Sequence, residues 1–191
     1  MLTSAILSDL DAISDIHMDS ITGSVSVLMG KKFVKNLYQT LFNDDNSTIL
    51  VYKENNELIG FITYTTDFRK TNEEIKTKFS LSQMLIFLLK VTTNIHTMKL
   101  FIQQFLFHLY FPNHRIQGYI FIFTLAIKSR YRKQGIGTKL IKHIKIISRK
   151  SHSSIFLDTA GSNQKAINFY QKAGFHQVFN AFDNIGFLYQ P

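Results

Sequence analysis

A short basic turn lies between Arg130 and Thr138, where the chain reads Arg-Tyr-Arg-Lys-Gln-Gly-Ile-Gly-Thr. It follows an apolar run typical of a strand, 119–127, and opens a lysine-rich run with helical spacing, 135–150. Glycines let the backbone approach a ligand closely, and the N–H groups at a helix start attract anions. The turn therefore has the chemistry of a phosphate site, with a solvated surface turn as the alternative.

Three side chains of the turn, Arg130, Arg132 and Lys133, add positive charge, and arginine can bind a phosphate through two parallel donors. Other phosphate-binding loops match less well. No stretch supplies the Gly-x-x-x-x-Gly-Lys-Ser/Thr of a Walker loop, and Leu140 stands where a dinucleotide fingerprint needs its third glycine.

Positive charge is concentrated around this turn. The 191-residue chain has a net charge of +9, and residues 128–150 contain nine Lys or Arg and no Asp or Glu. Such clustering indicates an anionic partner. Because no aromatic-interleaved RNA-binding pattern or paired zinc ligands accompany it, we expect a polyphosphate cofactor and no nucleic acid.

The chain contains no cysteine. This removes disulfides, thiolate zinc sites and any cysteine-bound covalent intermediate. It fits a reducing compartment, and the first residues lack the basic and apolar regions of a secretory signal, so we expect a cytoplasmic protein. The seven histidines show no metal-ligand spacing, so we expect no metal.

Apolar periodicity along the chain predicts helices and strands in alternation. Helices are expected at 9–21, 31–42, 135–150 and 163–173, strands at 2–7, 47–52, 58–64, 119–127, 155–158, 175–179 and 185–189, and a loop at 23–30.

The segment 67–118 is irregular. A charged stretch, 69–78, is followed by two strongly apolar runs, 81–91 and 95–111. Their longest unbroken apolar part is far short of the ~20 residues that span a bilayer, so we expect no transmembrane segment. The two runs are interpreted as buried helices packed on the sheet. A lid over an acceptor site, a dimer surface and a peripheral membrane contact are the alternatives, which leaves monomer and homodimer open.

A second motif follows at 163–175, Asn-Gln-Lys-Ala-Ile-Asn-Phe-Tyr-Gln-Lys-Ala-Gly-Phe. Ala166, Phe169, Tyr170 and Ala173 share one face of the expected helix, and Gly174 would end it. By itself this is an amphipathic core helix.

In this order the two motifs resemble the GNAT family, the Gcn5-related N-acetyltransferases. The family's first motif, Arg/Gln-x-x-Gly-x-Gly/Ala between a strand and a helix, matches 132–137. The second, Asn-x-x-Ala-x-x-Phe-Tyr-x-x-x-Gly-Phe, matches 163–175. The resemblance is close over about 117–180 and holds only in outline over the first 66 residues. The segment 67–118 is longer than the family's usual connection.

The resemblance implies one GNAT-like domain over 1–191 with a helical insert at about 68–117. Its fold class would be α/β (α+β), a mixed, mostly antiparallel central sheet of about six or seven strands flanked by helices. This is the acyl-CoA N-acyltransferase fold.

The resemblance also implies acetyl-CoA as co-substrate. Its pyrophosphate would lie in the 134–138 turn, and its pantetheine arm would pair with the strand 119–127, one of whose N–H groups would polarise the thioester carbonyl. The donor-binding residues it assigns are Leu125, Ala126, Ile127, Arg132, Lys133, Gln134, Gly135, Ile136, Gly137, Thr138, Asn163 and Tyr170. Tyr170 would also protonate the leaving thiolate as the catalytic acid, with a core tyrosine as the alternative.

The general base is open. Many family members use a glutamate on the fourth strand, but the strand 119–127 has no carboxylate. His114, Asp158 and Asp183 are candidates, each with a structural or solvated role as the alternative.

The leading hypothesis is an acyltransferase that moves acetyl to a primary amine of a small molecule by direct attack in a ternary complex. One alternative keeps the fold and acetylates a protein N-terminus or lysine. Another is a non-catalytic module that binds acyl-CoA or a membrane surface. Nothing in the sequence identifies the acceptor.

Overall fold

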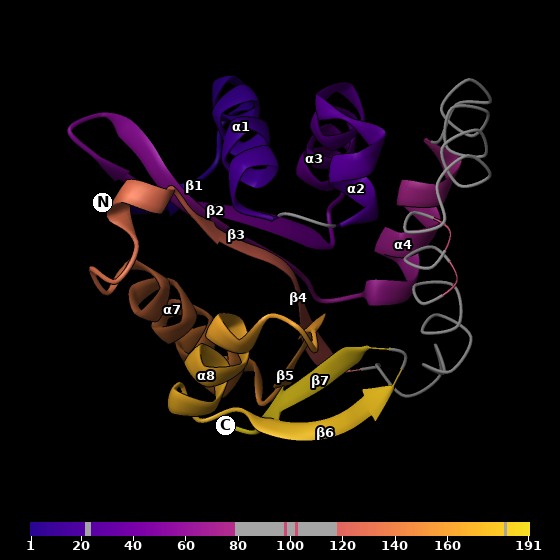
Figure 1. The fold of residues 1–191 in the computed structure, drawn as a ribbon, viewed down its shortest axis with the longest axis vertical. Helices are drawn as coiled ribbons and strands as arrows, with labels where there is room; N and C mark the ends of the chain where they lie inside the picture. Colours follow the sequence, from indigo (N-terminus) through magenta and orange to yellow (C-terminus); the bar gives the residue numbers. More distant parts are fainter. Residues whose placement is uncertain (22–23, 79–97, 99–101, 103–117, 182) are drawn as a thin grey trace.

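One mixed sheet of seven strands organises the part of the chain that the structure describes (Figure 1). The computed structural model describes residues 1–21, 24–78, 98, 102, 118–181 and 183–191. The strand order is β1-β2-β3-β4-β5-β7-β6. The strands are β1 (Leu2–Ser4), β2 (Ser47–Glu54), β3 (Glu57–Thr65), β4 (Tyr119–Ile127), β5 (Ser154–Ala160), β6 (His176–Ala181) and β7 (Asn184–Tyr189).

Helices flank this sheet. They are α1 (Leu10–Ser20), α2 (Val25–Met29), α3 (Lys31–Asn43), α4 (Phe68–Thr77), α7 (Ile136–Ser151) and α8 (Gln164–Lys172), with short 3-10 turns η1 (Leu7–Asp9) and η2 (Ser129–Tyr131). Only β4 and β5 pair in parallel among the described strands, because α7 crosses over between them; the other five pairings are antiparallel. The expected mixed, mostly antiparallel sheet is confirmed.

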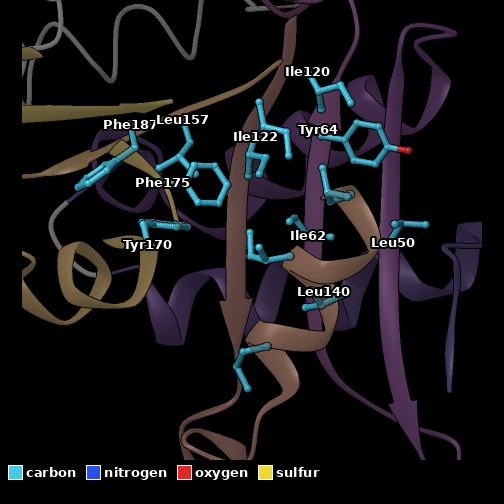
Figure 2. Close-up of a cluster of buried hydrophobic side chains, with 14 of the residues drawn as sticks. Leu50, Ile62, Tyr64, Ile120, Ile122, Leu140, Leu157, Tyr170, Phe175 and Phe187 are labelled. Atoms are coloured by element: carbon cyan, nitrogen blue, oxygen red, sulfur yellow. The ribbon is translucent and has the colours of Figure 1, made fainter. Parts of the chain in front are cut away.

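Two hydrophobic cores lie on the two faces of the sheet. Strand residues alternate between faces, so Phe61 of β3 packs with α1 and α3, whereas Ile62 packs with α7 and α8. Figure 1 shows these helix pairs on opposite sides of the sheet. Figure 2 shows the second core, where Leu140 of α7 and Tyr170 of α8 meet side chains of β2 to β5 and β7.

Two segments differ from the sequence expectation. The expected loop at 23–30 contains α2, whose first turn is capped by the Ser24 hydroxyl accepting from the Val27 N–H at 3.3 Å. The charged stretch at 69–78 forms most of α4, capped by Asp67 accepting from the Lys70 N–H. Side-chain caps stabilise helices that lack a long apolar stripe, which explains why apolar periodicity missed both.

The expected helices at 81–91 and 95–111 lie outside the described residues, apart from the exposed Met98 and Ile102. No helix among the residues that the structure describes is long and apolar enough to cross a membrane.

Candidate functional site

β4 and β5 separate part of the way along their length. Their parallel pairing runs from Tyr119↔Ser154 to Ile122↔Leu157 and then ends. Beyond this fork, residues 123–127 of β4 stay with β3, and 158–160 of β5 stay with β7. No described strand pairs with the second edge of 123–127. An unpaired strand edge offers N–H and C=O groups to an extended ligand.

A β-bulge lies at this fork. Thr63 of β3 pairs with Thr124, but the next β3 residue, Tyr64, pairs with Ile122, so Phe123 is the extra residue on β4. Bulges re-aim backbone groups and are frequent beside active sites. The predicted donor-binding residues Leu125, Ala126 and Ile127 follow immediately along the unpaired edge; the side chain of Ala126 is buried, so a ligand there would meet backbone.

The basic turn leads from β4 into α7. Lys133 and Gly135 both have left-handed backbone, with φ of 62° and 79°, and no side chain caps the helix. Within the described residues, nothing accepts a hydrogen bond from the N–H groups of Ile136, Gly137 or Thr138; the first N–H bonded is that of Lys139, to Gly135. Three unpaired N–H donors at a helix start are suited to bind an anion.

The two glycines of the turn have different roles. A Cβ at Gly135 would meet nothing within 4 Å, so glycine is needed there for its positive φ. A Cβ at Gly137 would lie 3.3 Å from Phe169 Cζ. Gly137 therefore lets the start of α7 pack closely on α8, which brings the two sequence motifs together.

A carboxylate from the β2–β3 hairpin binds three side chains where the chain enters the turn. Glu57 accepts from Lys128 Nζ at 2.7 Å, from the Tyr131 hydroxyl at 2.9 Å and from Arg130. These hydrogen bonds, that of Lys128 first, lower the pKa of Glu57 to about 2.

The sequence analysis grouped Arg130 with the cations that could bind a phosphate. In the structure its guanidinium is instead hydrogen-bonded to Glu57. Arg132 donates through Nε to the Ile127 carbonyl at 3.1 Å, which ties the turn to the end of β4. Gln134 donates to the Arg130 carbonyl at 3.2 Å. Lys133 is exposed and extends from the turn. No sequence pattern links Glu57 to residues more than 70 positions away.

Tyr170 of α8 lies at the fork side of the second core, beside Phe175 and Phe187 (Figure 2). Its side chain is 8% exposed. Burial, and then the charge of Asp158, raise the pKa of Tyr170, so its hydroxyl keeps its proton at neutral pH. The hydroxyl is therefore available as a hydrogen-bond donor.

Asp158 is the first β5 residue beyond the fork. Leu157 belongs to the α7/α8 core, while Phe156 stacks on Phe121, so strand alternation puts Asp158 on the opposite face from Leu157. Burial raises the pKa of Asp158 to about 6. Sequence analysis named this carboxylate as one of three candidate bases; its position at the fork is a feature of the tertiary structure.

The other residues predicted from the sequence lie in three different settings. Asn163 caps α8, where its Oδ1 accepts from the Ala166 N–H at 3.2 Å, and its amide nitrogen is left for other contacts. Asp183 is exposed in the β6–β7 turn, and its carbonyl accepts from the Gly161 N–H at 2.7 Å. His114 lies outside the described residues. Within the described ranges, no three His, Asp or Glu side chains gather as a metal site.

Comparisons with known proteins agree with this geometry. Residues 105–175 match the family model of the acetyltransferase (GNAT) family. N-alpha-acetyltransferase 50 of Danio rerio is 43% identical over 64 residues, which are 32% of this chain and 38% of that protein. The chain thus matches little more than a third of that relative's length.

Solved structures share the fold over the whole chain. A protein from Pyrococcus horikoshii superposes with a TM-score of 0.65 at 15% identity, covering 100% of this chain and 99% of that one. NAA60 of Arabidopsis thaliana, in complex with acetyl-CoA, gives 0.60 at 19% identity, covering 100% and 97%. The chain is therefore similar to the GNAT family over residues 105–175, and it shares the fold of these solved structures.

Proposed function

We propose that this protein is an acetyltransferase that uses acetyl-CoA to acetylate a primary amine. The observation that carries the proposal is the alignment of three features at one end of the sheet. These are the unpaired edge of β4 at 123–127, the uncapped start of α7, and the Asp158–Tyr170 pair at the fork. The family match over 105–175 supports it.

The donor has a continuous binding path. The N–H groups of 136–138 bind the pyrophosphate, with Lys133 adding charge, Gly135 giving the turn its shape, and Arg132 and Gln134 holding it through their backbone contacts. The backbone of Leu125, Ala126 and Ile127 pairs with the pantetheine arm as an added strand. The Asn163 amide nitrogen bonds the same arm.

Acetyl-CoA supplies an activated acetyl thioester at the fork. Asp158 takes the proton that the acceptor ammonium must lose, so that the nitrogen lone pair forms the new N–C bond. As the C–S bond breaks, Tyr170 gives its proton to the departing thiolate and recovers one from solvent. The β4 backbone at the bulge donates a hydrogen bond to the thioester oxygen, where negative charge develops.

The acceptor is a primary amine of one of two kinds. The sequence analysis favours a small molecule. A protein N-terminus is the second candidate, supported by the name of the Danio rerio relative, which describes an N-alpha-acetyltransferase. Cytoplasmic location and a single domain over 1–191 stay predictions.

Two measurements test the proposal. Isothermal titration with acetyl-CoA is expected to show binding, and no heat of binding at millimolar ligand would overturn the donor site. CoA release is then measured with a panel of small amines and of peptides that differ in their first residue. Release with small amines alone or with peptides alone decides between the two acceptors. Binding without release across both sets would support a non-catalytic acyl-CoA-binding module instead.

A further inference from the structure

The β2–β3 hairpin contacts the basic turn, although it supplies no group to the donor path described above. Glu57 is the first residue of β3, at the end of this hairpin. Its Oε1 accepts from Lys128 Nζ at 2.7 Å and from the Arg130 guanidinium, and its Oε2 accepts from the Tyr131 hydroxyl at 2.9 Å. All three donors lie in 128–131, where the chain enters the basic turn. Because they converge on one carboxylate, they fix the position of this segment.

Backbone contacts join the same two parts of the chain. The Lys128 N–H donates to the Ile59 carbonyl of β3 at 2.9 Å, and the Tyr131 N–H donates to the Lys128 carbonyl at 2.9 Å. The Arg130 guanidinium lies over the Tyr131 ring, 5.0 Å from its centroid. The segment 128–131 is therefore attached to β3 by its main chain at one point and by three side chains at Glu57.

The hairpin also contacts the first turn of α7, on the other side of the basic turn. Lys139 Nζ donates to the Tyr52 hydroxyl of β2 at 3.1 Å. Between these two attachments, Lys133 and Gly135 have positive φ, and the N–H groups of 136–138 have no acceptor among the described residues. An anion site made of such N–H groups binds best when its backbone is ordered beforehand, since ordering it on binding costs affinity.

We propose that Glu57 is a positioning residue that holds 128–131, and through it the basic turn, in the shape that receives a pyrophosphate. The pyrophosphate belongs to acetyl-CoA, so this inference rests on the proposed function. Charge alone has the opposite effect, because a carboxylate near an anion site repels the anion. Removal of Glu57 should therefore weaken binding if Glu57 positions the turn, and should strengthen it if its charge dominates.

Glu54 offers a matched control for the charge. It pairs with Glu57 across the hairpin and is exposed, and within the described residues its side chain forms no hydrogen bond or ion pair. Glu54→Gln and Glu57→Gln each remove one negative charge from the same hairpin, but only Glu57→Gln disturbs the contacts with 128–131. Tyr131→Phe removes one of these contacts, the hydroxyl bond to Glu57, without any change of charge.

The first measurement is acetyl-CoA affinity by calorimetry. The Glu57 side chain is 34% exposed, so we expect a modest effect, with affinity about tenfold weaker in Glu57→Gln and about threefold weaker in Tyr131→Phe. The double variant should bind about as weakly as Glu57→Gln, because both changes act through one carboxylate. Glu54→Gln should stay within about twofold of the wild type, since an exposed charge is screened by salt.

The second measurement separates positioning of the turn from general stability. For an acceptor found in the amine panel, Glu57→Gln should raise KM for acetyl-CoA and leave kcat within about twofold, because bound donor still reaches the fork in the same geometry. With S-acetylpantetheine, which lacks the pyrophosphate, kcat/KM should equal that of the wild type. An equal loss with both donors would overturn the inference and leave Glu57 a purely structural role.

Two further outcomes decide the matter. If Glu57→Gln bound acetyl-CoA as tightly as Glu54→Gln or more tightly, the inference would be wrong, and Glu57 would instead compete with the phosphates for Lys128 and Arg130. NMR amide exchange over 131–138 should be faster in Glu57→Gln than in Glu54→Gln, and equal exchange would also overturn the inference. If the proposed function fails, the wild type binds no acetyl-CoA, while this exchange difference persists.

Discussion

Asp158 acts electrostatically on Tyr170 from the opposite face of the sheet. Asp158 belongs to β5 and Tyr170 to α8, and the charge of Asp158 contributes to the raised pKa of Tyr170. Asp158 lies one residue beyond the last β4–β5 pair. In the proposed mechanism, Asp158 accepts a proton and Tyr170 donates one.

Asp158→Asn should lower kcat, because the amide cannot accept the proton of the acceptor amine. The expected loss is roughly 10²- to 10⁴-fold, typical of general base removal. Only the ionised carboxylate accepts a proton, and its pKa is raised to about 6. Wild-type kcat should therefore rise as pH increases through about 6, and the variant should lack this limb. Asp183→Asn, at the exposed β6–β7 turn, should keep both kcat and its pH dependence. If kcat of Asp158→Asn still rose through about pH 6, that titration would belong to another group.

Tyr170→Phe should reduce turnover more than acetyl-CoA affinity. The ring stays in its core position, whereas the proton for the leaving thiolate is lost, and the expected loss in kcat is about 10²-fold or more. Kinetics and calorimetry measure the two effects separately. Tyr64→Phe is the matched control, since Tyr64 is a similarly buried tyrosine of the same core, 7% against 8% exposed. Equal kcat in both variants would remove Tyr170 from the acid role.

Gly135→Asp should abolish acetyl-CoA binding in calorimetry. It introduces a side chain at a backbone φ of 79° and a negative charge beside the uncapped N–H groups of α7. Gly30→Asp adds the same residue at a φ of 93°, at the start of α3. It should cost comparable stability without affecting acetyl-CoA affinity. Retained affinity in Gly135→Asp would refute the anion site at this turn.

His17 should make the fold sensitive to acid. Its pKa is about 4 in the folded protein against 6.5 without burial, so the unfolded chain binds more protons between these values. The free energy of unfolding should therefore fall as pH decreases from 6.5 to 4, by at most on the order of 3 kcal/mol. Urea unfolding of wild type and His17→Gln at several pH values measures this.

The test compares how the free energy of unfolding changes with pH in the wild type and in His17→Gln. Asp158, with its raised pKa, contributes in the opposite direction, since its stabilising effect is present at low pH and is lost as pH rises from 3.8 through about 6. His152→Gln, at an exposed position after α7, should leave the pH dependence as in wild type. If the free energy of unfolding of His17→Gln fell with decreasing pH as steeply as that of the wild type, the prediction would be wrong.

Local patterns predicted most of the described elements. The strand at 119–127 is observed with the same bounds, because β-branched and aromatic residues make up most of it. The helix at 135–150 is observed as α7, one residue later at each end. By contrast, α2 and α4 depend on single capping side chains and on contacts such as those of Thr71 with Asp44 and Thr65, which no periodicity reveals.

Local sequence predicts the basic turn, the helix that carries Tyr170 and their resemblance to the GNAT family, because each depends on a few consecutive residues. What these segments face depends on the tertiary structure. The fork beside Asp158, the bonds of Glu57 with Lys128, Arg130 and Tyr131, and the buried hydrogen bond between His17 and Tyr38 all join residues far apart in the chain. Strand pairing and packing create such contacts, and neither spacing nor composition encodes them locally.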